Sequence, residues 1–263
     1  MSAMGNCGTG YYRAHCSDIN GVIDFDAGLV GSNMPGKRAG HMIRLERDIL
    51  SKNGAFARAN RDRLKAAGVF ALNLISSPGS GKTSLLVRAI ADLGHRFPIN
   101  VIEGSPHTSN ADRIHGTGIH DIQITTGWGG CLDAHMVGHA LDQLPLTPGS
   151  LLFIENVGNL VCPAAVDLGE AHKVVVLSVT EGDDKPLKYP DVFAESDLML
   201  LNKVDLLPYV DFDIGRCRKF ALRVNPQIQI INVSARTGEG LPAFCNWLEW
   251  RSSLARRPAY ASV

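Results

Sequence analysis

The amino-acid sequence predicts an α/β fold: a three-layer sandwich with a mostly parallel sheet and helices on both faces. Seven continuous apolar runs of strand length recur along the chain, at residues 69–75, 99–103, 121–125, 151–154, 173–179, 198–201 and 229–233. Segments with helical spacing separate these runs, and this alternation is typical of parallel strands that are buried on both sides. Polar motifs directly follow several runs, and ligands of parallel sheets bind at the carboxyl ends of the strands.

Composition narrows the class of protein. The chain has 263 residues, of which 45% are apolar and 20% charged, and its formal net charge is +0. One ordinary α/β domain with a tail fits these values, and a neutral chain gives no reason to expect nucleic acid as a partner. No apolar run approaches the roughly 20 residues of a bilayer span, and the N-terminus lacks the pattern of a signal peptide. We therefore expect a cytoplasmic protein without a membrane partner, whose six scattered cysteines are reduced thiols or metal ligands rather than disulfides.

Four segments divide the chain in order. Residues 1–36 are rich in glycine, serine and asparagine, and they predict a flexible N-terminal arm. Residues 37–68 are basic and carry apolar residues at helical spacing, which predicts one or two amphipathic helices. Residues 69–255 hold all seven predicted strands and a closing helix, and residues 256–263 form a C-terminal tail.

The main domain is organised around a phosphate-binding loop. The string SSPGSGKT at 76–83 follows the first apolar run and precedes a helical segment, the context that defines such a loop. Its glycines let backbone N–H groups turn toward phosphate oxygens, and Ser76 replaces the usual first glycine. Lys82 can reach the β- and γ-phosphates, and the Thr83 hydroxyl can bind Mg²⁺. The expected phosphate-binding residues are Gly79, Ser80, Gly81, Lys82, Thr83 and Ser84. The fold class is therefore that of the P-loop NTPases.

Two further motifs predict guanine as the base. Asn202, Lys203 and Asp205 directly follow the strand at 198–201. The Asp205 carboxylate can accept from guanine N1–H and from the exocyclic amine, whereas adenine lacks both donors in that arrangement. Three residues after the last strand can present a backbone N–H to guanine O6: Ser234, Ala235 and Arg236. Each motif alone could be a surface turn, but their order and positions predict that residues 69–255 form a GTPase (G) domain.

A carboxylate and a glycine after the 151–154 strand predict the catalytic switch. Glu155 can hold a Mg²⁺-bound water, and Gly158 can donate its N–H to the γ-phosphate. The alternative is that Glu155 only caps the end of the strand. With Lys82 and Thr83 these two residues form the predicted catalytic set. No catalytic glutamine or arginine finger is evident, which predicts slow hydrolysis that depends on dimerisation or on a partner.

Cysteines and histidines near the switch predict a second ligand. Cys131, His135 and His139 are spaced to share one face of a helix predicted from residue 131 to 144, and Cys162 closely follows Glu155. Such side chains bind Zn²⁺ or Ni²⁺. For the two histidines, ordinary surface imidazoles are an equally good interpretation. The small number of ligands predicts a site shared across a dimer interface.

These motifs together resemble the HypB family, SIMIBI-type P-loop GTPases that help insert nickel into [NiFe]-hydrogenase. The resemblance covers most of the chain and depends on four strings: SSPGSGKT at 76–83, IENVGNLVCP at 154–163, SVTEGDDKPLKYP at 178–190 and LNKVDLLPYVDFD at 201–213. It implies GTP and Mg²⁺ as cofactors, Ni²⁺ or Zn²⁺ at an interface of a GTP-linked homodimer, and partnership with a HypA-type nickel chaperone and the hydrogenase large subunit.

The chain departs from the family pattern in three places. Gly130 and Cys131 stand where members usually carry Cys-His, residues 5–10 contain one cysteine instead of a cysteine cluster, and Ser105 replaces an acid. A GTP-dependent regulatory switch without metal cargo is therefore an alternative. Another is a related chaperone for urease or a cobalamin-dependent mutase.

Overall fold

The computed structural model describes the backbone of residues 14–16, 22–25, 38–105, 111–126, 130–161 and 166–255. Side chains are described for residues 52–105, 113–126, 130–161 and 166–255. Within these ranges, no helix is long and apolar enough to cross a membrane.

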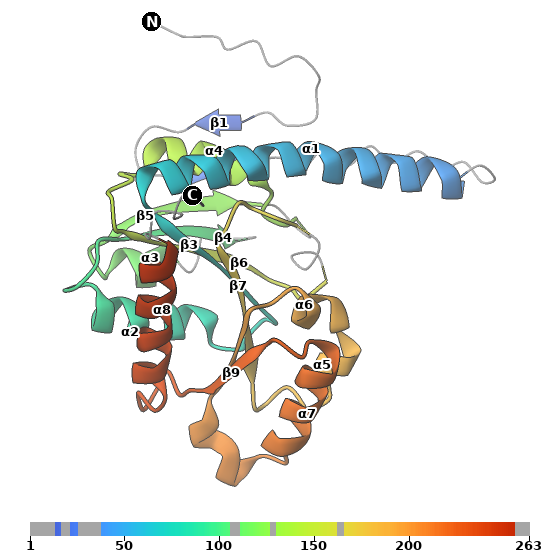
Figure 1. The fold of residues 1–263 in the computed structure, drawn as a ribbon, viewed down its shortest axis with the longest axis vertical. Coiled ribbons are helices and arrows are strands. Elements are labelled where there is room, and N and C mark those ends of the chain that lie inside the picture. The colour runs from blue at the N-terminus through green and yellow to red at the C-terminus, as the bar shows by residue number, and fades with distance from the viewer. Residues whose placement is uncertain are drawn as a thin grey trace, which may run out of the picture.

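In the part of the chain that the structure describes, nine strands form one sheet in the order β1-β2-β5-β4-β6-β3-β7-β8-β9 (Figure 1). The strands are β1 (Ala14–Cys16), β2 (Val22–Phe25), β3 (Phe70–Ser76), β4 (Ile99–Ser105), β5 (His120–Thr125), β6 (Leu151–Gly158), β7 (His172–Ser178), β8 (Leu198–Asn202) and β9 (Gln229–Asn232). Every neighbouring pair is parallel except β1 with β2. The seven predicted strands are all present, and the predicted fold class is confirmed. Strands β1 and β2 were not predicted, because they are too short to show a pattern.

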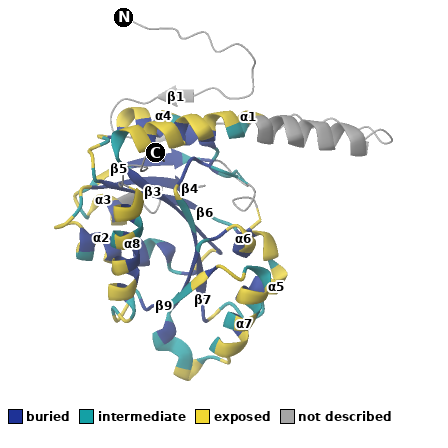
Figure 2. Cartoon of the chain, viewed as in Figure 1, coloured by how far each residue is buried: buried dark blue, intermediate teal, exposed yellow. Residues whose placement is uncertain are grey.

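Helices cover both faces of this sheet. They are α1 (Arg38–Ala67), α2 (Lys82–Leu93), α3 (Ala111–His115), α4 (Ala134–Gln143), α5 (Lys185–Lys188), α6 (Pro190–Ala194), the 3-10 helix η2 (Val204–Tyr209), α7 (Ile214–Val224) and α8 (Leu241–Ala255). The basic segment that predicted one or two helices forms the one helix α1 in its described residues, and Gly68 directly after this helix has a φ of 67°. The outer faces of the helices are exposed, whereas the sheet between them is buried (Figure 2).

Alternate side chains of the strands supply three apolar clusters. Leu72 and Phe153 pack with α2 and α8 on one face. On the other face, Ile102 packs with α1 and α4, and Met199 packs with helices α6 and α7 farther along the sheet. Because both faces are covered, only the strand ends remain accessible, and the polar motifs lie at the carboxyl ends.

Candidate functional site

The phosphate-binding loop lies between β3 and α2 and lines an open cavity of about 520 Å³. The ends of β4 and β6, Arg113 and Lys203 complete the lining. Gly79 and Gly81 have φ values of 75° and 91°, a backbone conformation that side chains with a Cβ rarely adopt. A Cβ added at Gly81 would lie 2.6 Å from the Asn202 Nδ2 atom, so only glycine fits there. The loop is therefore shaped by its glycines in the way that the motif predicts.

Three of the four predicted catalytic side chains meet at one carboxylate oxygen. The Lys82 ammonium lies 3.2 Å from Glu155 Oε1 and donates to the Asn156 carbonyl at 2.5 Å. The Thr83 hydroxyl donates to the same Glu155 oxygen at 2.5 Å. The other oxygen, Oε2, is buried and has no hydrogen-bond partner among the described residues. A buried anionic oxygen without a donor is costly, and a divalent cation beside Thr83 would satisfy it, so these residues fit Mg²⁺.

Gly158, the fourth member of the set, ends β6 against the phosphate loop. A Cβ at this position would lie 3.2 Å from the Pro78 Cα atom and 3.3 Å from the Pro78 nitrogen. Glycine therefore permits close contact between the end of β6 and the loop backbone. Glu155 lies inside β6 and does not cap its end, so the alternative that it serves only as a strand cap is wrong.

Glu103 is a site residue that sequence analysis missed. It lies beside Glu155 because β4 pairs with β6 in a register that makes Glu103 and Glu155 direct neighbours. Burial, with the negative charge of Glu155 as the next cause, raises the pKa of Glu103 to about 7, and Lys82 opposes the shift. A charged residue at the end of an apolar run was the available signal, but the strand order that brings the two carboxyl groups together is not visible in sequence.

The base-reading loop is tied directly to the phosphate loop. The Asn202 amide donates to the Ser80 carbonyl at 2.9 Å, and its oxygen accepts from the Ala235 backbone N–H at 3.2 Å. The Lys203 ammonium donates to the Gly79 carbonyl at 2.6 Å. Lys203 has a φ of 63°, the only positive value of a non-glycine residue in the described part of the chain. These contacts bring three motifs that are far apart in the sequence to one edge of the sheet.

The predicted guanine acceptor is held by a buried serine. The Ser234 hydroxyl donates to Asp205 Oδ1 at 2.6 Å and also accepts from the Thr237 N–H at 3.1 Å. Ser234 is fully buried, so the carboxylate is oriented by a fixed donor. Arg236 is exposed, and its backbone N–H is the group predicted to face the base.

Arg113 lines the same cavity and was not among the predicted site residues. Its guanidinium donates from Nη2 to the Ser84 hydroxyl at 3.0 Å, which holds it beside the first turn of α2. Sequence analysis predicts only a short helix or a loop around residue 113 and no role for this side chain.

The predicted cysteine and histidine set is only partly described. Helix α4 begins at Ala134 rather than at residue 131, because Asp133 has an extended backbone and its side chain caps the helix by accepting from the Met136 N–H at 2.8 Å. The prediction that Cys131 shares a helical face with His135 and His139 is therefore wrong. The two histidines do meet, with 3.1 Å between their Nε2 atoms.

The cysteines differ from expectation as well. Cys131 is held in a disulfide, whereas reduced thiols were expected, and its partner lies outside the described side chains. Cys162 also lies outside the described residues. Among the residues that are described, no three histidine, cysteine or acidic side chains are close enough to share a metal ion.

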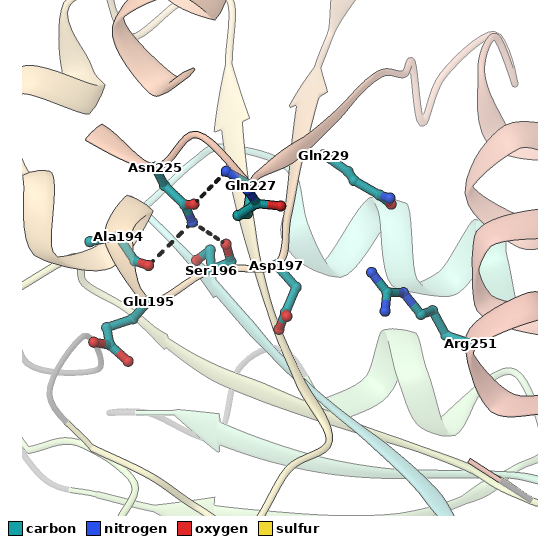
Figure 3. Close-up of a pocket in the computed structure, with 8 residues that line it drawn as sticks. All are labelled: Ala194, Glu195, Ser196, Asp197, Asn225, Gln227, Gln229 and Arg251. Atoms are coloured by element: carbon teal, nitrogen blue, oxygen red, sulfur yellow. Dashed lines mark hydrogen bonds between the residues drawn. The ribbon is translucent and has the colours of Figure 1, made fainter. Parts of the chain in front are cut away.

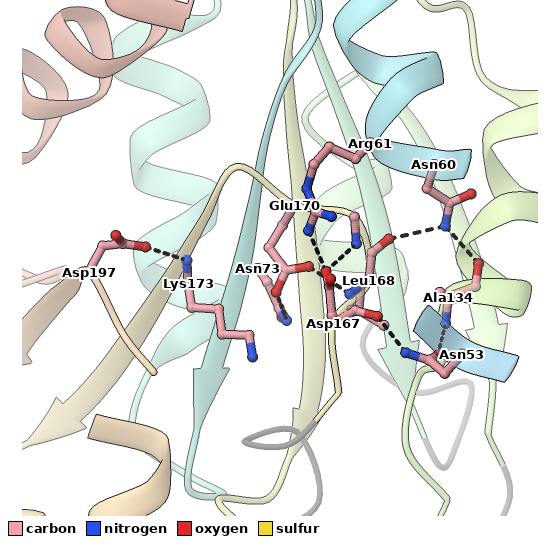
Figure 4. A network of polar contacts seen from close by, with 11 residues as sticks. Asn53, Asn60, Arg61, Asn73, Ala134, Asp167, Leu168, Glu170, Lys173 and Asp197 are labelled. Carbon is pink, nitrogen blue, oxygen red and sulfur yellow. Dashed lines mark hydrogen bonds and ion pairs between the residues drawn. The ribbon is translucent and has the colours of Figure 1, made fainter. Parts of the chain in front are cut away.

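Helix α1 holds the start of α4 and the segment that leads into β7 (Figure 4). The Asn60 amide donates to the Ala134 carbonyl at 2.7 Å and to the Leu168 carbonyl at 3.0 Å. Asn53 accepts from the Ala134 N–H at 2.8 Å and donates to the Asp167 carbonyl at 2.7 Å. Sequence analysis did not predict a structural role for these two asparagines, because they lie in no recognisable motif.

A second hollow of about 410 Å³ lies at the other edge of the sheet (Figure 3). Asp197 and Gln229 border it at the amino ends of β8 and β9, and Arg251 of α8 closes one side. Nucleotides bind at the carboxyl ends of parallel strands, so we assign the nucleotide to the cavity around Lys82.

Comparison with known proteins agrees with this geometry. Residues 70–232 match the family model described as CobW/HypB/UreG, nucleotide-binding domain. Hydrogenase maturation factor HypB of Rhizobium leguminosarum bv. viciae is 62% identical over 245 residues, which cover 93% of this chain and 81% of that protein. The same factor of Escherichia coli K12 is 53% identical over 230 residues, or 87% of this chain and 79% of that protein.

Solved structures give the same result. The crystal structure of HypB from Helicobacter pylori in complex with nickel has a TM-score of 0.73 and 36% identity, covering 80% of this chain and 99% of that chain. HypB from Archaeoglobus fulgidus has a TM-score of 0.72 and 37% identity, covering 77% of this chain and 99% of that chain. The resemblance found in the motifs is confirmed, and the chain belongs to the HypB family of hydrogenase maturation factors.

Proposed function

We propose that this chain is a GTP-binding and slowly GTP-hydrolysing metallochaperone that assists nickel insertion during [NiFe]-hydrogenase maturation. The observation that carries the proposal is the direct bonding of the base-reading loop to the phosphate loop through Asn202 and Lys203. One bound nucleotide would therefore contact both loops at once. Family membership supports the maturation role.

The described residues have distinct roles toward GTP. Lys82 leaves Glu155 and pairs with the β- and γ-phosphates, and the loop N–H groups from Gly79 to Ser84 surround the phosphate oxygens. Thr83 and Glu155 would hold Mg²⁺, which neutralises charge on the phosphates when it is bound. Gly158 donates its backbone N–H to the γ-phosphate.

Guanine selection is assigned to Asp205, oriented by Ser234, with the backbone N–H of Arg236 directed at guanine O6, because the Ala235 N–H already donates to Asn202. A base without the matching donors would leave the Asp205 carboxylate unpaired, and this cost provides discrimination. Slow turnover is supported by the lining of the cavity, in which no described residue is a glutamine.

The metal half of the proposal assigns Ni²⁺, or Zn²⁺, to Cys131 and Cys162, with His135 or His139 as further ligands. The disulfide at Cys131 must be reduced before its sulfur can act as a thiolate ligand. A Helicobacter pylori relative has been solved in complex with nickel, which supports nickel as the cargo. A GTP-linked homodimer that acts in the cytoplasm with a HypA-type chaperone and the hydrogenase large subunit completes the proposal.

Nucleotide binding is tested with fluorescent GDP, displaced by GTP or ATP, on the reduced full chain. We expect GTP to displace the probe at far lower concentration than ATP, and Lys82→Ala to abolish tight binding. Lys219→Ala on α7 is the matched control and should bind like the parent. Equal displacement by both nucleotides would contradict the proposal.

A second candidate is a GTP-dependent switch without metal cargo, favoured by Gly130 and by the disulfide at Cys131. It predicts GTP-dependent dimerisation with no effect of Ni²⁺ on turnover. Sedimentation and GTPase rates of the reduced chain, with and without Ni²⁺, separate the two candidates. A change in rate that is lost in Cys131→Ala and Cys162→Ala favours the metallochaperone.

A further inference from the structure

Three polar side chains form a buried network between strands β3 and β6 and the segment that leads into β7: Asn156, Asn73 and Glu170. We propose that this buried network holds the backbone of Asn156 in place for the nucleotide and couples the position of Lys82 to helix α1. Asn73 and Glu170 are then positioning residues, since neither lines the cavity. The network itself does not depend on GTP, whereas the movement of Lys82 that it senses rests on the proposed function.

Asn73 has an unusual position for an amide. It is the one polar residue in the apolar run of β3 at 70–75, and it is fully buried. It lies on the same face of the sheet as Ala71 and Ile75, which belong to two different apolar clusters. A buried amide is costly unless it is hydrogen-bonded, and an apolar side chain of the same shape would avoid that cost. The contacts of Asn73 therefore indicate its role better than its packing does.

One end of the buried network contacts the phosphate site through a backbone carbonyl. The Asn156 side-chain amide donates to Asn73 Oδ1 at 3.3 Å, and its oxygen accepts from the Val157 N–H at 2.9 Å. The backbone carbonyl of Asn156 accepts from the Lys82 ammonium at 2.5 Å. Asn73 therefore fixes the residue that shares Lys82 with Glu155.

The other end of the buried network reaches α1 (Figure 4). The Asn73 amide donates to Glu170 Oε1 at 3.1 Å, and Glu170 Oε2 accepts from the Leu168 N–H at 2.7 Å. The Leu168 carbonyl accepts from Asn60 of α1 at 3.0 Å. A Cβ added at Gly169 would lie 2.6 Å from the Asn60 Cβ atom, so this segment packs directly against the helix. A continuous series of hydrogen bonds therefore runs from Lys82 to α1.

Lys82 gives the buried network two arrangements to distinguish. Without nucleotide, its ammonium is held by the Asn156 carbonyl and by Glu155. Under the proposed function it turns to the phosphates, and the carbonyl loses this donor while the side chain of Asn156 stays bonded to Asn73. Hydrogen bonds in a chain polarise one another, so the loss changes the next contacts, at Glu170 and then at α1. Coupling between distant sites requires an element with two arrangements, and Lys82 is that element.

Hydrogen exchange of backbone amides tests this coupling on the reduced full chain, with and without Mg²⁺ and a non-hydrolysable GTP analogue. In the parent we expect the analogue to slow exchange at 76–84 and to change exchange roughly fivefold or more at 57–64 and 166–170. Asn73→Leu should keep the response at 76–84 and lose the other two. Asn100→Leu on β4 is the matched control, because Asn100 is 3% exposed and donates to a backbone carbonyl outside the network at 2.9 Å. Its response should equal that of the parent.

Nucleotide affinities give a second readout that a merely structural role would not change. In Asn73→Leu the ratio of GTP affinity to GDP affinity should fall roughly tenfold, while GDP affinity stays within about threefold. The reason is that the segment facing the γ-phosphate is no longer held. Glu170→Gln, which cannot accept from two donors through its amide nitrogen, should lose the exchange response at 57–64 even if Asn73→Leu does not fold.

The outcomes separate the buried network from the nucleotide site. If the parent responds at 76–84 but not at 166–170, or if both variants respond like the parent, the coupling is overturned and the proposed function stands. If the parent does not respond at 76–84, the proposed function is overturned, and the coupling that rests on it is overturned as well.

Discussion

Replacing Glu103 by glutamine should stabilise the nucleotide-free protein, by an amount that grows as pH rises from 4.5 to 7 and is fully present above that. The pKa of this carboxyl is raised from 4.5 to about 7, mainly by burial and then by Glu155. The folded state therefore holds a proton that the unfolded chain has already released. Stability from this group is fully present below pH 4.5 and is lost as pH rises through 7.

The size of the effect follows from the shift. A difference of about 2.5 pKa units corresponds to about 3 kcal/mol at pH 8, because each unit is worth about 1.4 kcal/mol. At pH 5 the difference between the variant and the parent should fall below about 1 kcal/mol, since the folded carboxyl is then neutral and the unfolded one is ionised only in part. Glutamine copies the shape of the neutral acid and removes the titration.

Urea unfolding of the nucleotide-free chain in EDTA at pH 8 and pH 5 measures this difference. Glu239→Gln, at an exposed position, is the matched control and should change stability by less than about 0.5 kcal/mol at either pH. If Glu103→Gln is no more stable than the parent at pH 8, then Glu103 is not a buried, proton-holding carboxyl and the reasoning fails.

Three other substitutions test separate parts of the site. Asp205→Asn should weaken GTP binding on the order of a hundredfold or more. It should also improve the binding of xanthine nucleotides, because their second carbonyl accepts from the new amide. Competition dialysis measures both affinities. Arg113→Ala should lower the GTPase rate while GDP affinity stays within about threefold, and Arg113→Lys should recover part of the rate. Asn60→Ala should cost about 2 kcal/mol in urea unfolding, because two buried carbonyls lose their donor, whereas Arg58→Ala should cost almost nothing.

Each of these results can contradict its premise. Unchanged base preference in Asp205→Asn would mean that guanine is read elsewhere. A normal GTPase rate in Arg113→Ala would mean that this arginine only contacts Ser84 and takes no part in hydrolysis. Full stability of Asn60→Ala would mean that water replaces the amide in the contact between α1 and α4.

The nucleotide motifs could be predicted from sequence because each is local. The phosphate loop and the Asn202–Asp205 turn are short strings whose chemistry needs only their own spacing and a preceding strand. Parallel strands then bring their carboxyl ends together without further information. The contacts of Asn202 and Lys203 with the phosphate loop are the direct result.

Residues that act through neighbours in space could not be predicted in this way. Glu103 matters because β4 lies beside β6, and the sequence contains no mark of that order. Asn60 matters because α1 packs against α4, whose first residue, Ala134, accepts from the Asn60 amide. The sequence predicts a start of α4 at residue 131 because apolar periodicity continues back through Leu132, whereas the N-cap formed by Asp133 makes the helix begin at Ala134.

Under the proposed function, the contacts of Lys82 would also link GTP binding to the binding of a cation. In the nucleotide-free arrangement, Lys82 is the ammonium that faces Glu155, and it also opposes ionisation of Glu103. Once Lys82 turns to the phosphates, the two carboxyl groups lose that positive charge while both stay buried. A proton on Glu103 or a divalent cation at the free oxygen of Glu155 must then compensate. Under the proposed function a cation would be the better compensation at neutral pH, because it would also face the phosphate oxygens, and we therefore expect nucleotide and Mg²⁺ to bind together.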